Sequence, residues 1–275
     1  MTLISEAPER PPAAPGPVMS LKGITKRFGA VQALSAVDLE VYPGEVVALV
    51  GDNGAGKSTF VKILAGVYTP DEGSIVFDGQ EVSVPSPSAA RALGISSVFQ
   101  DLALADNLDV VANLFLGREI VHGVLDEEEM ERRSWELLRQ LSARIPSVRI
   151  PIASLSGGQR QTVAIARSLI GDPKVVILDE PTAALGVAQT AEVLNLVERL
   201  RERGLGVILI SHNLADVQAV ADRVAVLRLG RNNGTFRMKD VSYEEIIAAI
   251  TGATDNAVTR RAAAVAATAS EEGDQ

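Results

Sequence analysis

Gly51-Asp52-Asn53-Gly54-Ala55-Gly56-Lys57-Ser58-Thr59 is the stretch that decides the fold of this 275-residue chain. It matches the pattern G-x-x-x-x-G-K-[ST], in which glycines allow a tight turn and backbone N–H groups point inward. The apolar run 46–50 comes before it and predicts a buried parallel strand. Residues 59–65 follow without a breaker and predict a helix, whose N-terminus favours an anion. The sequence therefore predicts an α/β fold with a phosphate-binding loop, and a chance glycine-rich turn is the weaker alternative.

The residue types of this loop indicate which ligand it binds. Lys57 is expected to reach the β- and γ-phosphates of a nucleotide, and Ser58 is expected to bind Mg²⁺. The loop predicts nucleotide binding, but many families with different activities share it.

Composition narrows the possible functions. The net charge is −9 and the pI is about 4.9, whereas broad contact with a nucleic-acid backbone needs a basic surface. The absence of cysteine excludes disulfides and thiolate metal sites. No apolar run approaches the roughly 18–20 residues of a membrane span, and the N-terminus lacks a secretory signal pattern. We expect no nucleic-acid partner, and we expect any membrane association to come through another protein.

The chain divides into three parts. Residues 1–17 are rich in proline and predict a disordered leader, 18–252 form the folded domain, and 253–275 are expected to be a flexible tail. Within the domain, residues 101 to about 170 are mostly helical and interrupt an alternation of strands and helices. Expected strands are 18–24, 36–41, 74–77, 95–99, 175–178, 207–210, 224–227 and a short one near 235–236, with a turn at 26–29. Expected helices are 88–93, 109–117, 126–141, 156–170, 187–203 and 243–250.

Two further motifs are suited to nucleotide chemistry. The strand 175–178 ends in Asp179 and Glu180; an aspartate there can hold Mg²⁺, and the adjacent glutamate can orient or deprotonate water. The alternative is two ordinary loop carboxylates. Ser156, Gly157 and Gly158 open another helix, whose N-terminus could hold phosphate. A simple helix cap explains the serine but not both glycines. Because one chain needs one cradle for a γ-phosphate, this second one predicts that a partner subunit's nucleotide lands there.

The motifs, taken in order, resemble those of the ABC ATPase family. They are the loop 51–58, a strand-end Gln100, the segment 155–159, the acid pair and Ser211-His212. The resemblance covers roughly residues 18–250, and segment 155–159 is the family's own signature. It implies a P-loop NTPase with a RecA-like core, an antiparallel β subdomain and a helical subdomain at about 101–170. It also implies ATP hydrolysis by two copies packed head-to-tail, with two ATP molecules at their interface.

The resemblance assigns roles to single residues. Phe28 is expected to stack on adenine, although a core phenylalanine is an alternative, and His212 is expected to contact the γ-phosphate. His122 lacks such context and is expected at the surface. The implied catalytic residues are Glu180, His212, Lys57 and Gln100. The implied nucleotide-binding residues are Phe28, Gly51, Asn53, Gly54, Ala55, Gly56, Lys57, Ser58, Thr59, Ser156, Gly157, Gly158 and Gln159. The implied Mg²⁺ ligands are Ser58, Gln100 and Asp179.

A finer resemblance lies in residues 100–110, 113–119 and 181–187, which are similar to the ATPases of bacterial ribose, xylose and fructose importers. It implies permease subunits, a separate sugar-binding protein, a homodimer and a place on the cytoplasmic face of the membrane. Gly186 departs from the aspartate that the family often has there, which leaves open how the two sites communicate.

Two rival functions are a soluble ABC clamp acting on nucleic acid or another partner and a regulatory module with little turnover. The clamps usually carry coiled coils or tandem domains, and Lys57, Glu180 and His212 argue against the module. The sequence does not identify the sugar, and a different small solute is the alternative.

Overall fold

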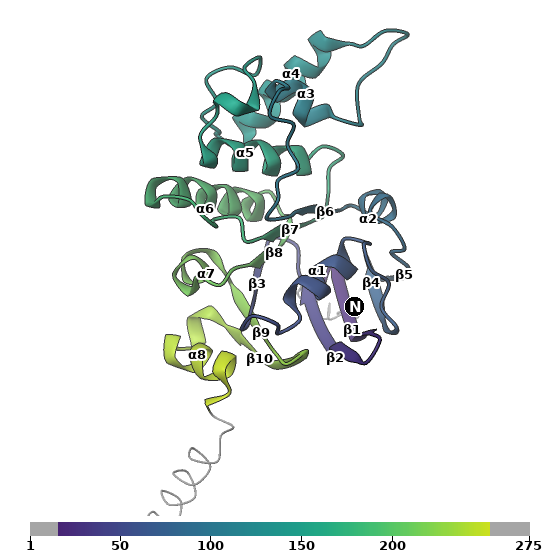
Figure 1. Ribbon diagram of the computed structural model, residues 1–275, viewed down its shortest axis with the longest axis vertical. Helices are drawn as coiled ribbons and strands as arrows, with labels where there is room; N and C mark the ends of the chain where they lie inside the picture. The colour runs from purple at the N-terminus through teal and green to yellow at the C-terminus, as the bar shows by residue number, and fades with distance from the viewer. Residues whose placement is uncertain (1–15, 254–275) are drawn as a thin grey trace, which may run out of the picture.

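A six-stranded sheet forms the centre of the fold in the computed structural model, which describes residues 16–253 (Figure 1). Its strand order is β10-β9-β3-β8-β7-β6; the five strands from β9 to β6 run parallel and β10 is an antiparallel edge. The strands are β3 (Val46–Val50), β6 (Ile95–Val98), β7 (Val175–Asp179), β8 (Gly206–Ile210), β9 (Arg223–Arg228) and β10 (Arg231–Arg237). The predicted leader and tail fall almost entirely outside the described residues.

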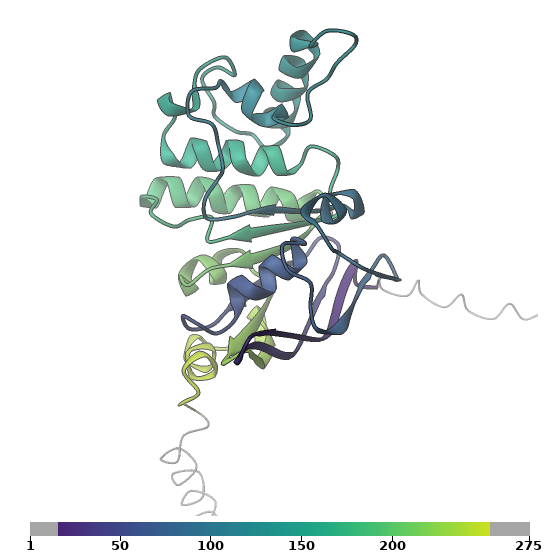
Figure 2. The same ribbon diagram turned by 45° about the vertical axis from the view of Figure 1, so that its right-hand side comes forward.

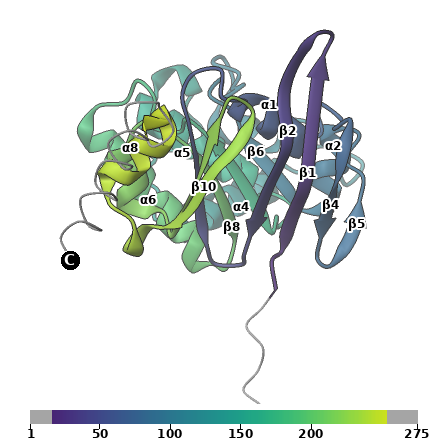
Figure 3. The ribbon, with the colours of Figure 1, turned by 90° about the horizontal axis from the view of Figure 1, so that it is seen from below.

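A second, antiparallel sheet has the order β2-β1-β4-β5 and lies to one side of the first (Figure 3). Its strands are β1 (Met19–Phe28), β2 (Val31–Val41), β4 (Glu72–Phe77) and β5 (Gln80–Val82). The expected β subdomain is therefore confirmed, but the expected turn at 26–29 begins too early, because the chain turns at 29–30. The first strand continues through Phe28, which pairs with Val31. Pairing across strands, rather than local composition, decides where these strands end.

Helices cover the parallel sheet, and a group of them extends from one end of the molecule (Figures 1 and 2). They are α1 (Lys57–Leu64), α2 (Pro87–Leu93), α3 (Val110–Phe115), α4 (Glu127–Gln140), α5 (Gly157–Ser168), α6 (Val187–Glu202), α7 (Leu214–Val220) and α8 (Tyr243–Thr251). Between β6 and β7 lie α3, α4 and α5, where the helical subdomain was expected, although 101–109 and 118–126 are not helical. The sequence did not predict α7 or β5. No helix in the described range 16–253 has the length and apolarity needed to span a bilayer.

Strand β3 separates two apolar cores. Val46, Ala48 and Val50 face the core that contains α5 and α6, whereas Val47 and Leu49 face the core that contains α1 and the antiparallel sheet. All five side chains are buried, as the alternation of a strand between two layers requires. This packing fixes the carboxyl end of β3, from which the glycine-rich loop starts.

Candidate functional site

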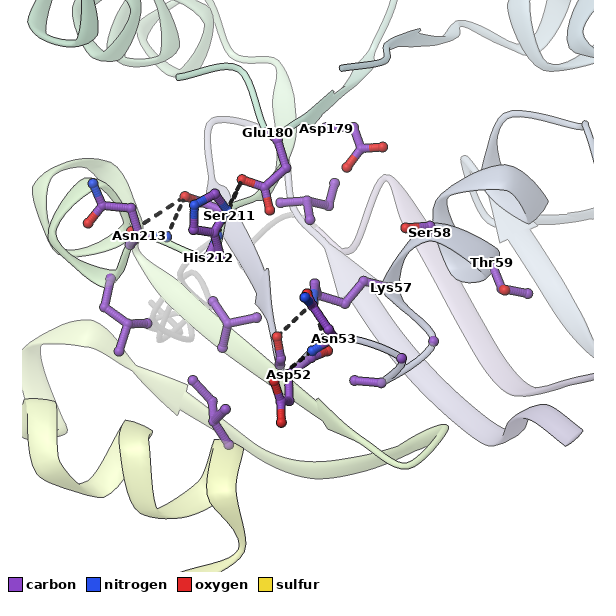
Figure 4. A pocket seen from close by; sticks show the side chains of 18 of the residues that line it. Asp52, Asn53, Lys57, Ser58, Thr59, Asp179, Glu180, Ser211, His212 and Asn213 are labelled. Atoms are coloured by element: carbon purple, nitrogen blue, oxygen red, sulfur yellow. Dashed lines mark hydrogen bonds and ion pairs between the residues drawn. The ribbon is translucent and has the colours of Figure 1, made fainter. Parts of the chain in front are cut away.

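Those predicted site residues that follow the carboxyl ends of neighbouring strands line one pocket of about 980 Å³ (Figure 4). The loop 51–59 follows β3, Gln100 follows β6, and Ser211-His212 follows β8. Asp179 is the last residue of β7, and Glu180 comes directly after it. Because parallel strands end at the same edge of a sheet, residues far apart in sequence meet there.

Two glycines of the loop are required by close approach of other backbone segments. A Cβ at Gly51 would lie 2.2 Å from the carbonyl oxygen of Leu227. Gly56 has φ 103°, in the left-handed region, and a Cβ there would lie 2.8 Å from the carbonyl oxygen of Ala33. Directly after it α1 begins at Lys57, so the loop ends at a helix N-terminus that can receive an anion.

The side-chain ammonium of Lys57 lies within this loop. Its Nζ donates to the carbonyl oxygens of Gly51, at 2.6 Å, and Asp52, at 3.0 Å. Burial lowers the pKa of the Lys57 ammonium, and the negative charges of Glu180, Asp52 and Asp179 oppose that shift. Because carbonyl oxygens carry no net charge, they do not neutralise the ammonium, which can therefore pair with a phosphate.

The residues predicted to hold Mg²⁺ offer the oxygen ligands that this ion prefers: the Ser58 hydroxyl, the Gln100 amide and the Asp179 carboxylate. Burial, and secondarily the charge of Glu180, raises the pKa of Asp179, while Lys57 lowers it. Within residues 16–253 no group of three or more His, Cys, Asp or Glu could hold a metal. The predicted set has one carboxylate and two neutral oxygens, and Mg²⁺ is usually held by one or two carboxylates together with substrate phosphates.

Glu180 and His212 contact each other. Glu180 has φ 52°, a left-handed conformation that is uncommon outside glycine and frequent at functional sites. Its Oε2 lies 2.7 Å from Nδ1 of His212, and its backbone N–H donates to the Ile210 carbonyl at 3.0 Å. The His212 side chain is 71% exposed, so the ring remains accessible from the pocket. The expected surface position of His122 is also confirmed, with its side chain 72% exposed.

Phe28 does not line the pocket, whose wall on this side begins at Val31. Phe28 is 42% exposed, so the alternative of a core phenylalanine is wrong. Its ring meets that of Tyr68 edge-on, with centroids 5.1 Å apart, and the Lys26 ammonium lies 5.7 Å from its centroid. Stacking of Phe28 on adenine stays a prediction.

The signature segment lies outside this pocket. Ser156 caps α5, and its Oγ accepts from the Gln159 N–H at 3.3 Å. The Gln159 Oε1 accepts from the Ser156 N–H at 3.0 Å, which completes a capping box. Both glycines also pack closely on α6 and the loop before it. A Cβ at Gly157 would lie 3.1 Å from Leu185, and one at Gly158 would lie 3.1 Å from Gln189. Close packing is therefore a structural reason for both glycines, in addition to their predicted role in binding phosphate.

One wall of the pocket has no counterpart among the sequence motifs. It is formed by three side chains of the last described helix, α8. They are Tyr243, Ile247 and Ile250. Their spacing is that of any amphipathic helix, so no sequence signal distinguished them from a surface stripe.

The fold and the pocket together define a P-loop nucleotide-hydrolysing protein: a glycine loop, a strand-end acid pair and a histidine share one end of a parallel sheet. Residues 34–183 match the model of the family described as ABC transporter. This chain belongs to that family and is one of its ATPases.

The chain is also similar to sugar import proteins. It is 44% identical to the xylose/arabinose import ATP-binding protein of Sulfolobus acidocaldarius over 85% of this chain and 94% of that one. It is 44% identical to the fructose import ATP-binding protein of Rhizobium meliloti over 86% and 95%. A ribose import ATP-binding protein of Rubrobacter xylanophilus, also 44% identical, is matched over only 47% of its length.

Solved structures of ATP-binding cassettes are similar in fold. A nucleotide-free cassette from an ABC transporter aligns with TM-score 0.75 and 27% identity, covering 86% of this chain and 95% of that one. A dimeric cassette in a post-hydrolysis state, bound to ADP and phosphate, aligns with TM-score 0.69 and 27% identity over 81% and 100%. The expected RecA-like ABC fold is confirmed.

Proposed function

We propose that this chain is the ATP-hydrolysing subunit of a monosaccharide importer, and that it works as a head-to-tail homodimer. The observation that carries the proposal is the separation of two half-sites. The pocket gathers the loop 51–59, Gln100, Asp179, Glu180 and His212, whereas the signature segment of the same chain does not line it. A second copy would supply the missing half.

Binding of ATP begins at the loop. The inward N–H groups and Lys57 hold the β- and γ-phosphates, and the adenine lies toward Phe28. Ser58, Gln100 and Asp179 would hold Mg²⁺, which when bound offsets negative charge on the phosphates. The raised pKa of the Asp179 carboxyl is consistent with a buried acid whose charge a cation stabilises.

In the hydrolysis step, Glu180 is the group placed to accept a proton from water. The water oxygen forms a bond to the γ-phosphorus, the bond from that phosphorus to the bridging oxygen breaks, and ADP leaves with inorganic phosphate. His212, whose Nδ1 lies 2.7 Å from Glu180 Oε2, donates to that carboxylate and orients it beside the γ-phosphate. Both residues sit on loops that begin at the ends of buried strands, so the geometry is set before ATP binds.

The transport partner is proposed from the relatives and from one surface. The names of the xylose/arabinose and fructose relatives describe import. The loop between α3 and α4 projects from the helical subdomain (Figure 2). It exposes an apolar patch of four side chains. They are Leu116 at 49%, Val121 at 60%, Val124 at 76% and Leu125 at 48% exposed. We assign the patch to the permease, which would hold the ATPase at the cytoplasmic face of the membrane while a separate binding protein delivers the sugar.

Sugar uptake tests this proposal. Cells of the source organism that lack this chain should lose uptake of labelled ribose, xylose or fructose, and the native chain should restore it. The Glu180→Gln variant should not restore uptake. A Val121→Ser/Val124→Ser double variant should hydrolyse ATP in solution but fail to restore uptake. If the cells lost uptake of none of these sugars while the purified chain hydrolysed ATP, the sugar assignment would be overturned and the ATPase assignment would stand.

A further inference from the structure

The helix that begins with the signature segment is bound at its other end to the loop that follows Gln100. Arg167 lies in the last turn of α5 and donates through Nη2 to the Leu102 carbonyl, at 2.6 Å, and through Nη1 to the Ala103 carbonyl, at 2.8 Å. Burial, and secondarily the charge of Arg118, lowers the pKa of Arg167. In the described part of the chain the guanidinium pairs with no carboxylate, and it donates hydrogen bonds to these two carbonyls.

Ala103 shows that this attachment fixes an unusual backbone. Its φ is 47°, in the left-handed region that favours glycine. Its N–H donates to Asp101 Oδ1 at 3.1 Å while its carbonyl accepts from Arg167. The two bonds restrain the same residue from both sides, three positions after Gln100.

The same loop is also fixed near the start of α5. The Ala153 N–H donates to the Asp106 carbonyl at 3.1 Å, and Nη1 of Arg160 lies 3.5 Å from the Asp106 carboxylate. Nε of Arg160 donates to the carbonyl of Leu155, the residue before the signature serine, at 3.2 Å. In the middle, the fully buried Asn113 accepts from the Ala105 N–H at 2.7 Å. The loop 101–109 is therefore attached at both ends of one helix.

A rigid helix can carry coupling between sites at its two ends. From Gly157 to Arg167 the ten steps span about 15 Å at 1.5 Å per residue. One end carries Ser156, predicted to meet the partner's ATP, and the other end holds the loop of Gln100, which lines this chain's own pocket. The attachment of Arg167 thus lies between the two half-sites of one chain.

We propose that Arg167 is a positioning residue that ties Gln100 to the signature helix, so that occupancy of a chain's own pocket sets the place of its signature in the partner's site. The inference rests on the proposed function, because it needs the head-to-tail pair. A guanidinium suits the task, since its planar fork of donors reaches two neighbouring carbonyls at once and stays charged when half-buried. Without it, both carbonyls lose a donor and Ala103 is free to leave its left-handed conformation.

The test compares Arg167→Ala with Arg118→Ala, a matched control. Arg118 is another half-buried arginine with a pKa lowered by burial, and it donates to the carbonyl of Ile170, just after α5, rather than to the loop 101–109. ADP affinity, kcat, KM and the Hill coefficient for ATP are measured for each purified variant. Arg167→Ala should bind ADP within twofold of the native chain, lose tenfold or more in kcat, and show a Hill coefficient near 1. Arg118→Ala should match the native chain in all four, and Arg167→Lys, which keeps a cation, should recover part of the kcat.

A second variant keeps the test decisive if Arg167→Ala does not fold. Asp101 is exposed, and Asp101→Ala releases Ala103 from the other side without emptying a buried position. It should lower kcat and cooperativity in the same direction, with ADP affinity again unchanged. The proposal is overturned if Arg167→Ala, or Asp101→Ala in its place, equals Arg118→Ala in kcat and Hill coefficient. A native chain that hydrolyses ATP without any cooperativity would instead count against the paired-site function itself.

Discussion

The pocket and the signature surface differ in how much of a nucleotide site each one provides. The pocket draws on four strand ends of one rigid sheet and offers a cradle, an acid pair and a histidine. The signature surface offers the N-terminus of α5, with Ser156 as its cap and two glycines packed on the loop and helix of 185–189. Under the proposed function, the pocket binds the nucleotide and the signature surface completes a site that another chain begins.

This difference assigns separate functions to two parts of one chain. In the proposed homodimer, affinity for nucleotide belongs to the pocket, so changes there should show in the isolated monomer. Closure over the γ-phosphate is assigned to the signature surface, so changes there should show only when two chains meet. A substitution in one region therefore tests whether the other region responds.

The largest effect is expected from Glu180→Gln. The amide keeps the size of the side chain but accepts no proton at neutral pH, so kcat should fall by about 10²–10⁴-fold. Steady-state release of phosphate measures it, with Glu198→Gln on α6 as a control carboxylate that pairs with Arg201 outside the pocket. Undiminished turnover in Glu180→Gln would remove this residue from the catalytic role.

Lys57→Ala should abolish tight binding of ATP. Losing charge-assisted bonds of about 1.5–3 kcal/mol corresponds to roughly 10- to 150-fold in Kd. Titration with a fluorescent ATP analogue measures the change, and Lys174→Ala, which removes an exposed lysine paired with Asp78, serves as the control. Unchanged affinity in Lys57→Ala would contradict the assignment of the loop.

Phe28→Ala should weaken ATP and ADP binding by similar amounts, about 1–3 kcal/mol, the range for a base stacked on an aromatic side chain. Because the same adenine is stacked before and after hydrolysis, turnover of bound ATP should change little. Phe28→Tyr keeps a ring and should bind nearly as the native chain does. A loss of turnover with unchanged affinity would show that Phe28 is not the adenine platform.

Sequence was sufficient where a motif directly follows a buried strand. The loop after β3, Gln100 after β6, the acid pair at the end of β7 and His212 after β8 were all predicted, because an apolar run locates the strand and the polar residues after it locate the edge. Parallel pairing then brings them into one pocket without further information.

Sequence was insufficient where a side chain bonds to a distant backbone. The bonds from Arg167 to the carbonyls of Leu102 and Ala103 leave no pattern, since every residue has a carbonyl. The length of β1 was missed for a related reason. A turn was expected from residue 26 on, but Lys26 and Arg27 pair with Leu34 and Gln32 and continue the strand.

The smallest effect is expected from Gly186→Asp. A Cβ at this N-cap of α6 meets nothing within 4 Å, so the aspartate fits and should stabilise the helix by a few tenths of a kcal/mol. If the missing carboxylate loosens communication between the paired sites, restoring it should change the Hill coefficient for ATP. An unchanged coefficient would show that the backbone of this loop suffices.

The central claim, that two chains complete each other's sites, is tested most directly by the mass of the Glu180→Gln variant in solution. Size-exclusion chromatography with light scattering, with and without Mg-ATP, gives that mass. With ATP bound but not hydrolysed, the variant should run at twice the 29.0 kDa of the chain, and without ATP as a monomer. Adding Ser156→Asp keeps a good helix cap but places a carboxylate against the partner's γ-phosphate, so that double variant should stay monomeric. A Glu180→Gln chain that binds ATP and remains a monomer at saturation would contradict the account.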